Sequence, residues 1–263
     1  HLYPIKNPYC EQNKNFRTVL QGWMQVCDYI SVWNYNLNHW NQLIPNPNMR
    51  VVEPNIRFFV ANNVRRVFMQ SPSGMSTEFS DLKNYVTNRL LWNPKLSGKR
   101  LRNEFLRLHY GQAAGPIGHY LDLLHSKAQA VTKSYMHFAG RTDNFGIDKE
   151  VIQAGLKAFE TALELVGDDE VLRARVEKAS ICAYAAAVAP ARYWGEDQGV
   201  EWNNQNYPKK AMPPEIARTR PYAKRLFELC EIYHVPFWGE GVPLKNIRDL
   251  IKRAYGLKED ESL

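Results

Sequence analysis

Apolar residues recur at two different intervals along the N-terminal part of the chain. Phe16, Leu20 and Trp23 follow the spacing of an amphipathic helix. The run over residues 29–35 is instead rich in aromatic and β-branched side chains, which is typical of a buried strand. In chain order, the pattern predicts a helix over residues 15–28, a strand over 29–35, a helix over 50–63, a strand over 64–70 and a helix over 78–92.

This alternation of helices and strands predicts parallel strands and an α/β fold. Two parallel strands are not stable alone, because both faces and both edges of their sheet need cover. We therefore expect either that the rest of a barrel is supplied elsewhere or that the strand predictions are wrong. The chain begins at His1 without a Met, and its first residues read as the end of a strand, so we expect further residues upstream.

After Asn93-Pro94 the pattern becomes mostly helical. We therefore predict two domains: the C-terminal part of a (β/α)8 barrel over residues 1–97 and an α-helical domain over residues 98–263. The charged tail from Lys258 is expected to fray. The predicted later elements are two helices over 98–139 broken near 111–116, helices over 148–166 and 168–190, a polar loop over 193–212, and helices over 213–233 and 243–255.

The charge distribution argues against a nucleic-acid partner. The 263 residues carry a formal net charge of +7, but Lys and Arg are interleaved with Asp and Glu, and no long basic run occurs. Aromatic residues make up 12% of the chain, including seven Trp, so flat faces are available either for a large core or for stacking on sugar rings. No segment has the length of a transmembrane helix, and no signal peptide is visible.

The four cysteines give no metal-binding pattern. Cys27, Cys182 and Cys230 fall on predicted apolar helix faces, so we expect buried thiols. Cys10 lies in a predicted loop, either free or bridged. We expect no metal and no cofactor.

Polar and aromatic residues cluster at the two predicted strand ends, where sites form in parallel α/β folds. Aromatic faces stack on the C–H face of a sugar, and amide or imidazole groups bind its hydroxyls. The alternative is that the aromatic residues pack inside a barrel and the asparagines form turns. The candidate carbohydrate-binding residues are Trp33, Asn34, Tyr35, Asn38, His39, Trp40 and Gln70.

Catalytic carboxylates are missing from these strand ends. Glycoside hydrolysis usually needs two carboxylic acids, but Asn34 and Met69 occupy the expected places. Glu78 lies near the start of a predicted helix, where it would complement the helix N-terminus. The catalytic residues therefore remain unknown.

Five ordered blocks of the sequence resemble the DUF4838 family. Trp33-Asn34-Tyr35 with Asn38, followed by Leu-Ile-Pro-Asn-Pro-Asn over 43–48, resembles "WDY…N…LLPFPN". Residues 54–70 resemble "PNIRFFVENNVKGVFEQG", residues 78–94 resemble "EFAELKAYLLAKLLWDP", and residues 104–125 resemble "DEFLNGYYGPAAPPIREYIDLLH". The upstream segment over 15–23 fits the same pattern.

The resemblance implies a fold, a function and a location. The family is related to α-glucuronidase-type barrels and includes the glycoside hydrolase family 163 endo-β-N-acetylglucosaminidases, which act on N-glycans. It implies a (β/α)8 barrel whose first strands lie upstream of His1, and a secreted, periplasmic or cell-surface protein. The chain departs from the pattern at Asn34, Met69 and Ser71, which replace Asp, Glu and Gly.

These departures leave several hypotheses open. Asn cannot transfer a proton at neutral pH, and Met can neither transfer one nor bind a hydroxyl strongly. The chain is then an enzyme with its acids on upstream strands, a glycan-binding module without catalysis, or an enzyme of different linkage specificity. A further alternative is a helical protein-interaction module, including a homodimer, in which Trp194, Trp202 and Tyr207 form the contact.

Overall fold

The computed structural model describes residues 5, 10–70, 78–131, 140–258 and 260–263. The predicted loop over 71–77, including Ser71, and the end of the predicted helical segment over 132–139 lie outside the described residues.

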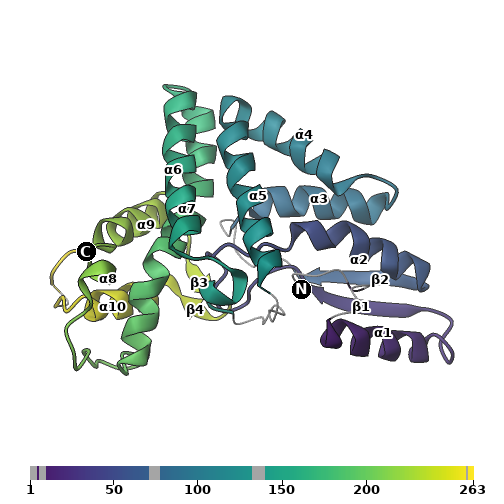
Figure 1. Ribbon diagram of the computed structural model, residues 1–263, viewed down its shortest axis with the longest axis horizontal. Coiled ribbons are helices and arrows are strands. Elements are labelled where there is room, and N and C mark those ends of the chain that lie inside the picture. The colour runs from purple at the N-terminus through teal and green to yellow at the C-terminus, as the bar shows by residue number, and fades with distance from the viewer. Residues whose placement is uncertain (1–4, 6–9, 71–77, 132–139, 259) are drawn as a thin grey trace.

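A two-stranded parallel sheet forms the N-terminal part of the molecule (Figure 1). Strand β1 spans Ile30–Tyr35 and β2 spans Val64–Gln70. Val32 lies opposite Val67, and Trp33 opposite Phe68. Both predicted strands, and their parallel arrangement, are therefore confirmed.

Helices α1 (Glu11–Trp23) and α2 (Met49–Ala61) pack on one face of this sheet. Val32 packs with Leu20 of α1 and Phe59 of α2 in a small apolar cluster. Side chains alternate between the two faces of a strand, so Trp33 lies on the other face, where it is 64% exposed. One face of the sheet is thus packed, and the other carries exposed side chains, including Trp33 and Phe68.

The fold is confirmed as a mixture of α-helices and β-strands, but a barrel is not shown. Within the described ranges, the strands form two separate two-stranded sheets. The second sheet is an antiparallel hairpin of β3 (Phe237–Gly239) and β4 (Val242–Pro243). The sequence pattern did not predict this hairpin, because its strands are too short to show alternation.

The rest of the chain is helical, as predicted. The helices are α3 (Ser80–Trp92), α4 (Gly98–Tyr110), α5 (Ala114–Ala130), α6 (Lys149–Val166), α7 (Glu170–Asp197), α8 (Pro214–Ala217), α9 (Arg220–Ile232) and α10 (Leu244–Ala254), with short 3₁₀ helices η1 (Gly111–Ala113) and η2 (Thr142–Phe145).

Helix α7 is longer than predicted and holds the C-terminal part in place. It continues through Pro190 to Asp197, so Trp194 is helical and does not belong to the predicted loop. A Cβ added at Gly195 would lie 2.8 Å from the Cβ of Ala254. The backbones of α7 and α10 therefore approach closely at this point. The β3–β4 hairpin leads directly into α10, so this contact also fixes the position of the hairpin.

One apolar core joins the two predicted domains. Leu43 and Ile44, before the predicted boundary at 97–98, belong to the same cluster as Val188 and Leu250, beyond it. The packing is therefore continuous across that boundary. The division into two domains stays a prediction.

The predicted fraying of the tail is wrong for its last residues. Leu263 is buried, and Arg220 donates a hydrogen bond to the Ser262 carbonyl oxygen over 2.9 Å. The apolar side chain of the last residue packs onto the core and anchors the tail.

Cys182 and Cys230 are buried, as predicted, and burial raises the pKa of both thiols. Cys10 is buried and free. Cys27 is exposed, because α1 ends at Trp23 rather than at the predicted residue 28.

Candidate functional site

The loop between β1 and α2 is held by buried amide groups. The Asn48 side chain donates to the Asn36 side chain over 2.8 Å, and Asn36 donates to the Thr87 hydroxyl of α3 over 3.1 Å. Buried polar groups of this kind fix one conformation, because an unpaired group costs free energy. The buried amide side chains of this loop are Asn36, Asn38, Asn41, Gln42, Asn46 and Asn48; within the described part of the chain, that of Asn46 has no hydrogen-bond partner.

The β3–β4 hairpin docks onto the same loop. The fully buried Trp238 donates its indole N–H to the Asn41 side chain over 2.9 Å. The Glu240 backbone N–H donates to the His39 carbonyl oxygen over 2.8 Å. A Cβ at Gly239 would lie 2.4 Å from the Trp40 carbonyl oxygen, so only glycine permits this approach. Two segments far apart in the sequence are thereby joined.

His39 lies between two side chains whose hydrogen bonds define its tautomer. Its Nδ1 contacts the Glu240 carboxylate, and its Nε2 lies 3.1 Å from the Gln70 amide nitrogen. The Gln70 oxygen accepts the Trp33 indole N–H over 2.8 Å, so its NH₂ group is the donor to His39. Neutral His39 therefore donates from Nδ1 to Glu240 and accepts at Nε2.

The neutral form of His39 is also favoured by its surroundings. The side chain is only 13% exposed, and burial lowers the pKa of His39. The Glu240 carboxylate in contact with Nδ1 favours the charged ring and therefore opposes this shift.

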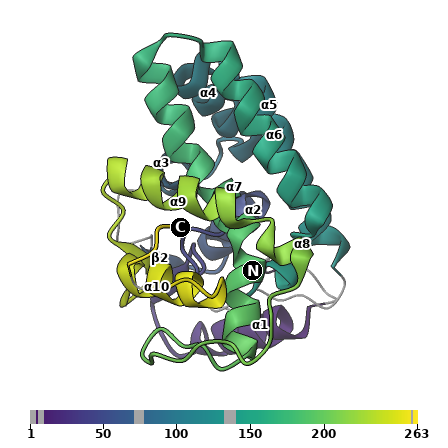
Figure 2. The same ribbon diagram turned by 90° about the vertical axis from the view of Figure 1, so that its left-hand side faces the viewer.

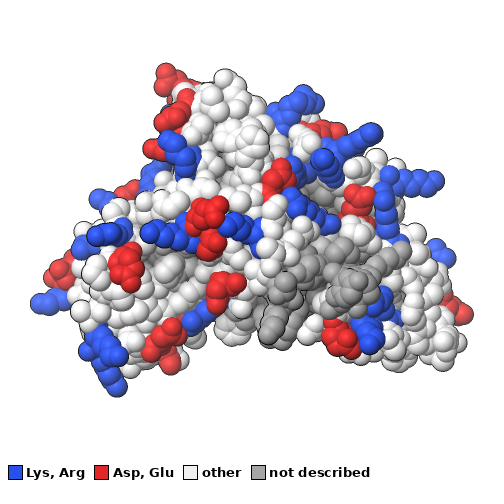
Figure 3. Space-filling view, in the orientation of Figure 1, with Lys and Arg blue, Asp and Glu red and all other residues white. Residues whose placement is uncertain are grey.

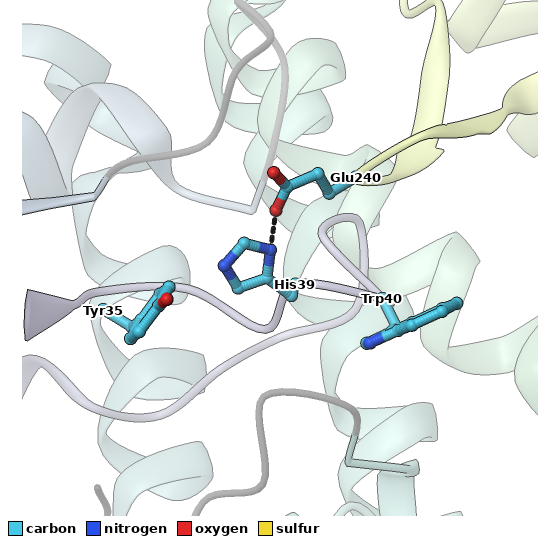
Figure 4. A pocket seen from close by; sticks show the side chains of 4 residues that line it. All are labelled: Tyr35, His39, Trp40 and Glu240. Atoms are coloured by element: carbon cyan, nitrogen blue, oxygen red, sulfur yellow. Dashed lines mark ion pairs between the residues drawn. The ribbon is translucent and has the colours of Figure 1, made fainter.

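Tyr35, His39, Trp40 and Glu240 line a pocket of about 330 Å³ (Figure 4). Tyr35 and Trp40 lie on either side of the His39–Glu240 pair, and both aromatic side chains are partly exposed. Small-molecule sites have volumes of about 300–1,000 Å³ and combine apolar walls with a few polar groups. The pocket therefore has two flat aromatic walls and a polar centre, and its volume lies within the range of small-molecule sites.

Five of the seven predicted residues lie together. Tyr35, His39 and Trp40 line the pocket, and Gln70 and Trp33 extend its hydrogen-bond chain. They continue into an exposed aromatic surface, since the Trp33 ring lies 4.9 Å from the Phe68 ring.

Asn34 and Asn38 are placed elsewhere. Asn34 lies on the opposite face of β1 from its neighbours, with its amide nitrogen 3.1 Å from the Met69 sulfur. Asn38 is buried and donates to the Gly140 carbonyl oxygen over 2.8 Å. Its contact supports the loop rather than the pocket.

Glu78 does not complement a helix N-terminus as predicted. Its carboxylate pairs with the Lys83 ammonium group, and both side chains are buried. Lys83 also donates to the Asn46 carbonyl oxygen over 2.9 Å. Burial raises the pKa of Glu78 to about 7, and the pairing with Lys83 opposes that shift. Glu78 is therefore a core group beneath the loop.

Glu240 is the carboxylate that the sequence reading missed. It lies far from the strand ends along the chain, and no local pattern links it to His39. The available signal was Trp238-Gly239-Glu240-Gly241, in which glycines flank an acidic residue, as in a tight turn. Among the described residues, no three His, Cys, Asp or Glu side chains gather as around a metal ion.

The surface and the helices show two further properties. On the face in Figure 3, blue and red side chains are interspersed over the described residues. No described helix is long and apolar enough to cross a membrane.

Comparison with known proteins assigns the N-terminal segment to a family. Residues 3–122 match the sequence model of a family described as a domain of unknown function, DUF4838. This segment of the chain belongs to the DUF4838 family. No curated protein and no solved structure matches the chain. The DUF4838 segment contains β1, β2 and the loop with His39, whereas Glu240 comes from beyond it.

Proposed function

We propose that this protein binds a carbohydrate in the pocket formed by Tyr35, His39, Trp40 and Glu240. The observation that carries the proposal is the pair of partly exposed aromatic rings beside a polar His–Glu pair. Such rings stack on the C–H face of a sugar, while the carboxylate and imidazole bind its hydroxyl groups. The exposed Trp33 extends the aromatic surface and supports a ligand longer than one sugar ring.

Complex glycans, including N-glycans, are the proposed ligand class. This choice rests on the resemblance of the sequence blocks to glycan-degrading relatives, and a secreted or cell-surface location belongs to the same proposal. The sheet face of β1 and β2 opposite α1 and α2 is exposed, which supports the expectation that further strands complete a barrel, because an apolar sheet face is normally covered.

Binding without hydrolysis is the alternative, and the carboxylates favour it. Within the described part of the chain, Glu240 is the one carboxylate that lines the pocket, and a glycosidase usually uses two. Hydrolysis therefore requires a second acid from outside the described residues. Release of reducing ends from an N-glycoprotein distinguishes an enzyme from a binder, which only retains the glycan.

Isothermal titration calorimetry with a panel of N-glycan oligosaccharides tests the proposal. We expect Tyr35→Ala and Trp40→Ala each to weaken binding by about tenfold, because each removes one stacking face. The matched control is Trp92→Ala at the end of α3, since Trp92 is 91% exposed and lies outside the pocket. Unchanged affinity in the two pocket variants, or equal loss in the control, contradicts the proposal.

A further inference from the structure

A second pocket lies between α10 and the segment that follows α7. The two are side by side in Figures 1 and 2, and the Tyr207 hydroxyl donates to the Leu257 carbonyl oxygen over 3.3 Å. The pocket has a volume of about 350 Å³. Among the described residues, the charged side chains that line it are one carboxylate, Asp249, and four cations, Lys245, Lys252, Arg253 and Lys258.

The lining follows from the sequence of α10. Ile247, Leu250 and Ile251 are buried and fix which side of the helix faces the core. Lys245, Asp249 and Lys252 recur at helical spacing along one stripe, so they reach the same pocket. The positive charge is therefore built into one side of a well-anchored helix.

Arg253 is the unusual member of this set. It is only 5% exposed, although buried guanidinium groups normally have a carboxylate partner. Its Nη2 donates to the Glu201 carbonyl oxygen over 2.9 Å, which anchors the segment after α7. Its Nε is buried without a hydrogen-bond partner. No described carboxylate lies within ion-pair distance of it, even though Asp249 is one turn earlier.

We propose that this pocket binds a doubly charged oxyanion, a phosphate or sulfate group. A planar guanidinium presents several donors in a fixed fork that matches such an anion, and lysine ammonium groups add charge. The exposed Lys245 and Lys258 side chains lie at the rim, where they reach an incoming anion. The volume leaves space for the organic group that carries the oxyanion. This site is separate from the carbohydrate pocket and does not depend on it.

Titration of the whole chain with inorganic phosphate or sulfate tests the proposal. Chloride at equal ionic strength is the reference, so that general screening is removed. The readouts are calorimetry and the Arg253 Nε–H resonance in NMR spectra. The test variant is Lys245→Gln/Lys258→Gln, which keeps Arg253 and changes only exposed residues. Its matched control is Lys95→Gln/Lys224→Gln, which removes the same charge from exposed positions outside the pocket.

We expect phosphate or sulfate to bind the wild type and shift the Arg253 resonance. The test variant should bind about tenfold more weakly, since two nearby charges are lost, and the control should bind as the wild type. A response to sulfate alone identifies a sulfated ligand, and a response to phosphate alone a phosphorylated one. No binding beyond that of chloride, no shift of Arg253, or equal weakening in the control overturns the proposal.

Discussion

The ring nitrogens of two histidines show how single residues are fixed in this protein. His39 has Glu240 on one side and Gln70 on the other, and it borders solvent in the pocket. His125 of α5 is instead buried, where its Nδ1 donates to the Leu121 carbonyl oxygen over 2.6 Å. Its Nε2 accepts the Met49 backbone N–H over 3.1 Å at the start of α2. The contact with Met49 requires the neutral ring, because a protonated Nε2 cannot accept a hydrogen bond.

Acid should therefore destabilise the fold through His125. Burial lowers the pKa of His125 from 6.5 to about 4, so the unfolded chain takes up a proton at a higher pH than the folded chain. His125 makes its whole contribution to the free energy of unfolding above pH 6.5, and this contribution is lost as the pH falls toward 4. The loss amounts to about 3 kcal/mol. Urea unfolding of the wild type and of His125→Gln across this range measures the difference.

The variant His119→Gln is the matched control, because His119 lies exposed on the same helix. We expect its pH dependence to equal that of the wild type, whereas His125→Gln should lose part of the acid sensitivity. Identical pH dependence in all three proteins would show that His125 does not carry the effect.

The residue types of the pocket could be predicted from the sequence, but the directions in which the side chains point were predicted only in part. Tyr35, His39 and Trp40 were identified because aromatic and polar residues cluster after a strand. Successive side chains of a strand point to opposite faces, so the sequence already implied that Asn34 points away from Trp33 and Tyr35. Glu240 was not, because its contact with His39 depends on the docking of a distant hairpin.

At the scale of elements, the buried Glu78–Lys83 pair connects the start of α3 to the loop that carries the pocket. We expect Lys83→Met to lower the free energy of unfolding by about 1–3 kcal/mol, because the buried carboxyl group loses its cation and takes up a proton, and the Asn46 carbonyl oxygen loses its donor. The double variant Glu78→Gln/Lys83→Met should be of similar stability to Lys83→Met, since the side chain at position 78 is neutral in both. Denaturant unfolding measures both. A loss below about 1 kcal/mol in Lys83→Met would contradict this role.

Elements with a strong local pattern were predicted well. The two parallel strands match because both segments contain β-forming side chains: residues 29–35 are rich in aromatic and β-branched residues, and residues 64–70 include Val64, Val67 and Phe68. Most helices match because their apolar faces are regular. Helix α7 runs beyond the predicted end at residue 190, although a Pro inside a helix usually ends or kinks it. The buried small residues around Pro190, including Ala189 and Ala191, let α7 pack closely enough to continue.

At the scale of the whole molecule, the pocket depends on both ends of the chain. The loop with His39 and Trp40 lies in the DUF4838 segment, and the hairpin with Glu240 follows the helical part. Long-range contacts of this kind are not visible in local sequence patterns, so the sequence did not predict this packing between the two predicted domains. The single apolar core on both sides of their boundary gives the reason that they pack together.

Saturation-transfer difference NMR with an N-glycan oligosaccharide tests the central claim most directly, using the wild type, Glu240→Ala and Glu231→Ala. Glu231 is an exposed residue of α9 and serves as the control. We predict transfer from protein aromatic protons to sugar C–H protons in the wild type and in Glu231→Ala, and a severalfold weaker signal in Glu240→Ala. Absence of transfer in the wild type, or an undiminished signal in Glu240→Ala, would contradict a carbohydrate pocket shared between the two ends of the chain.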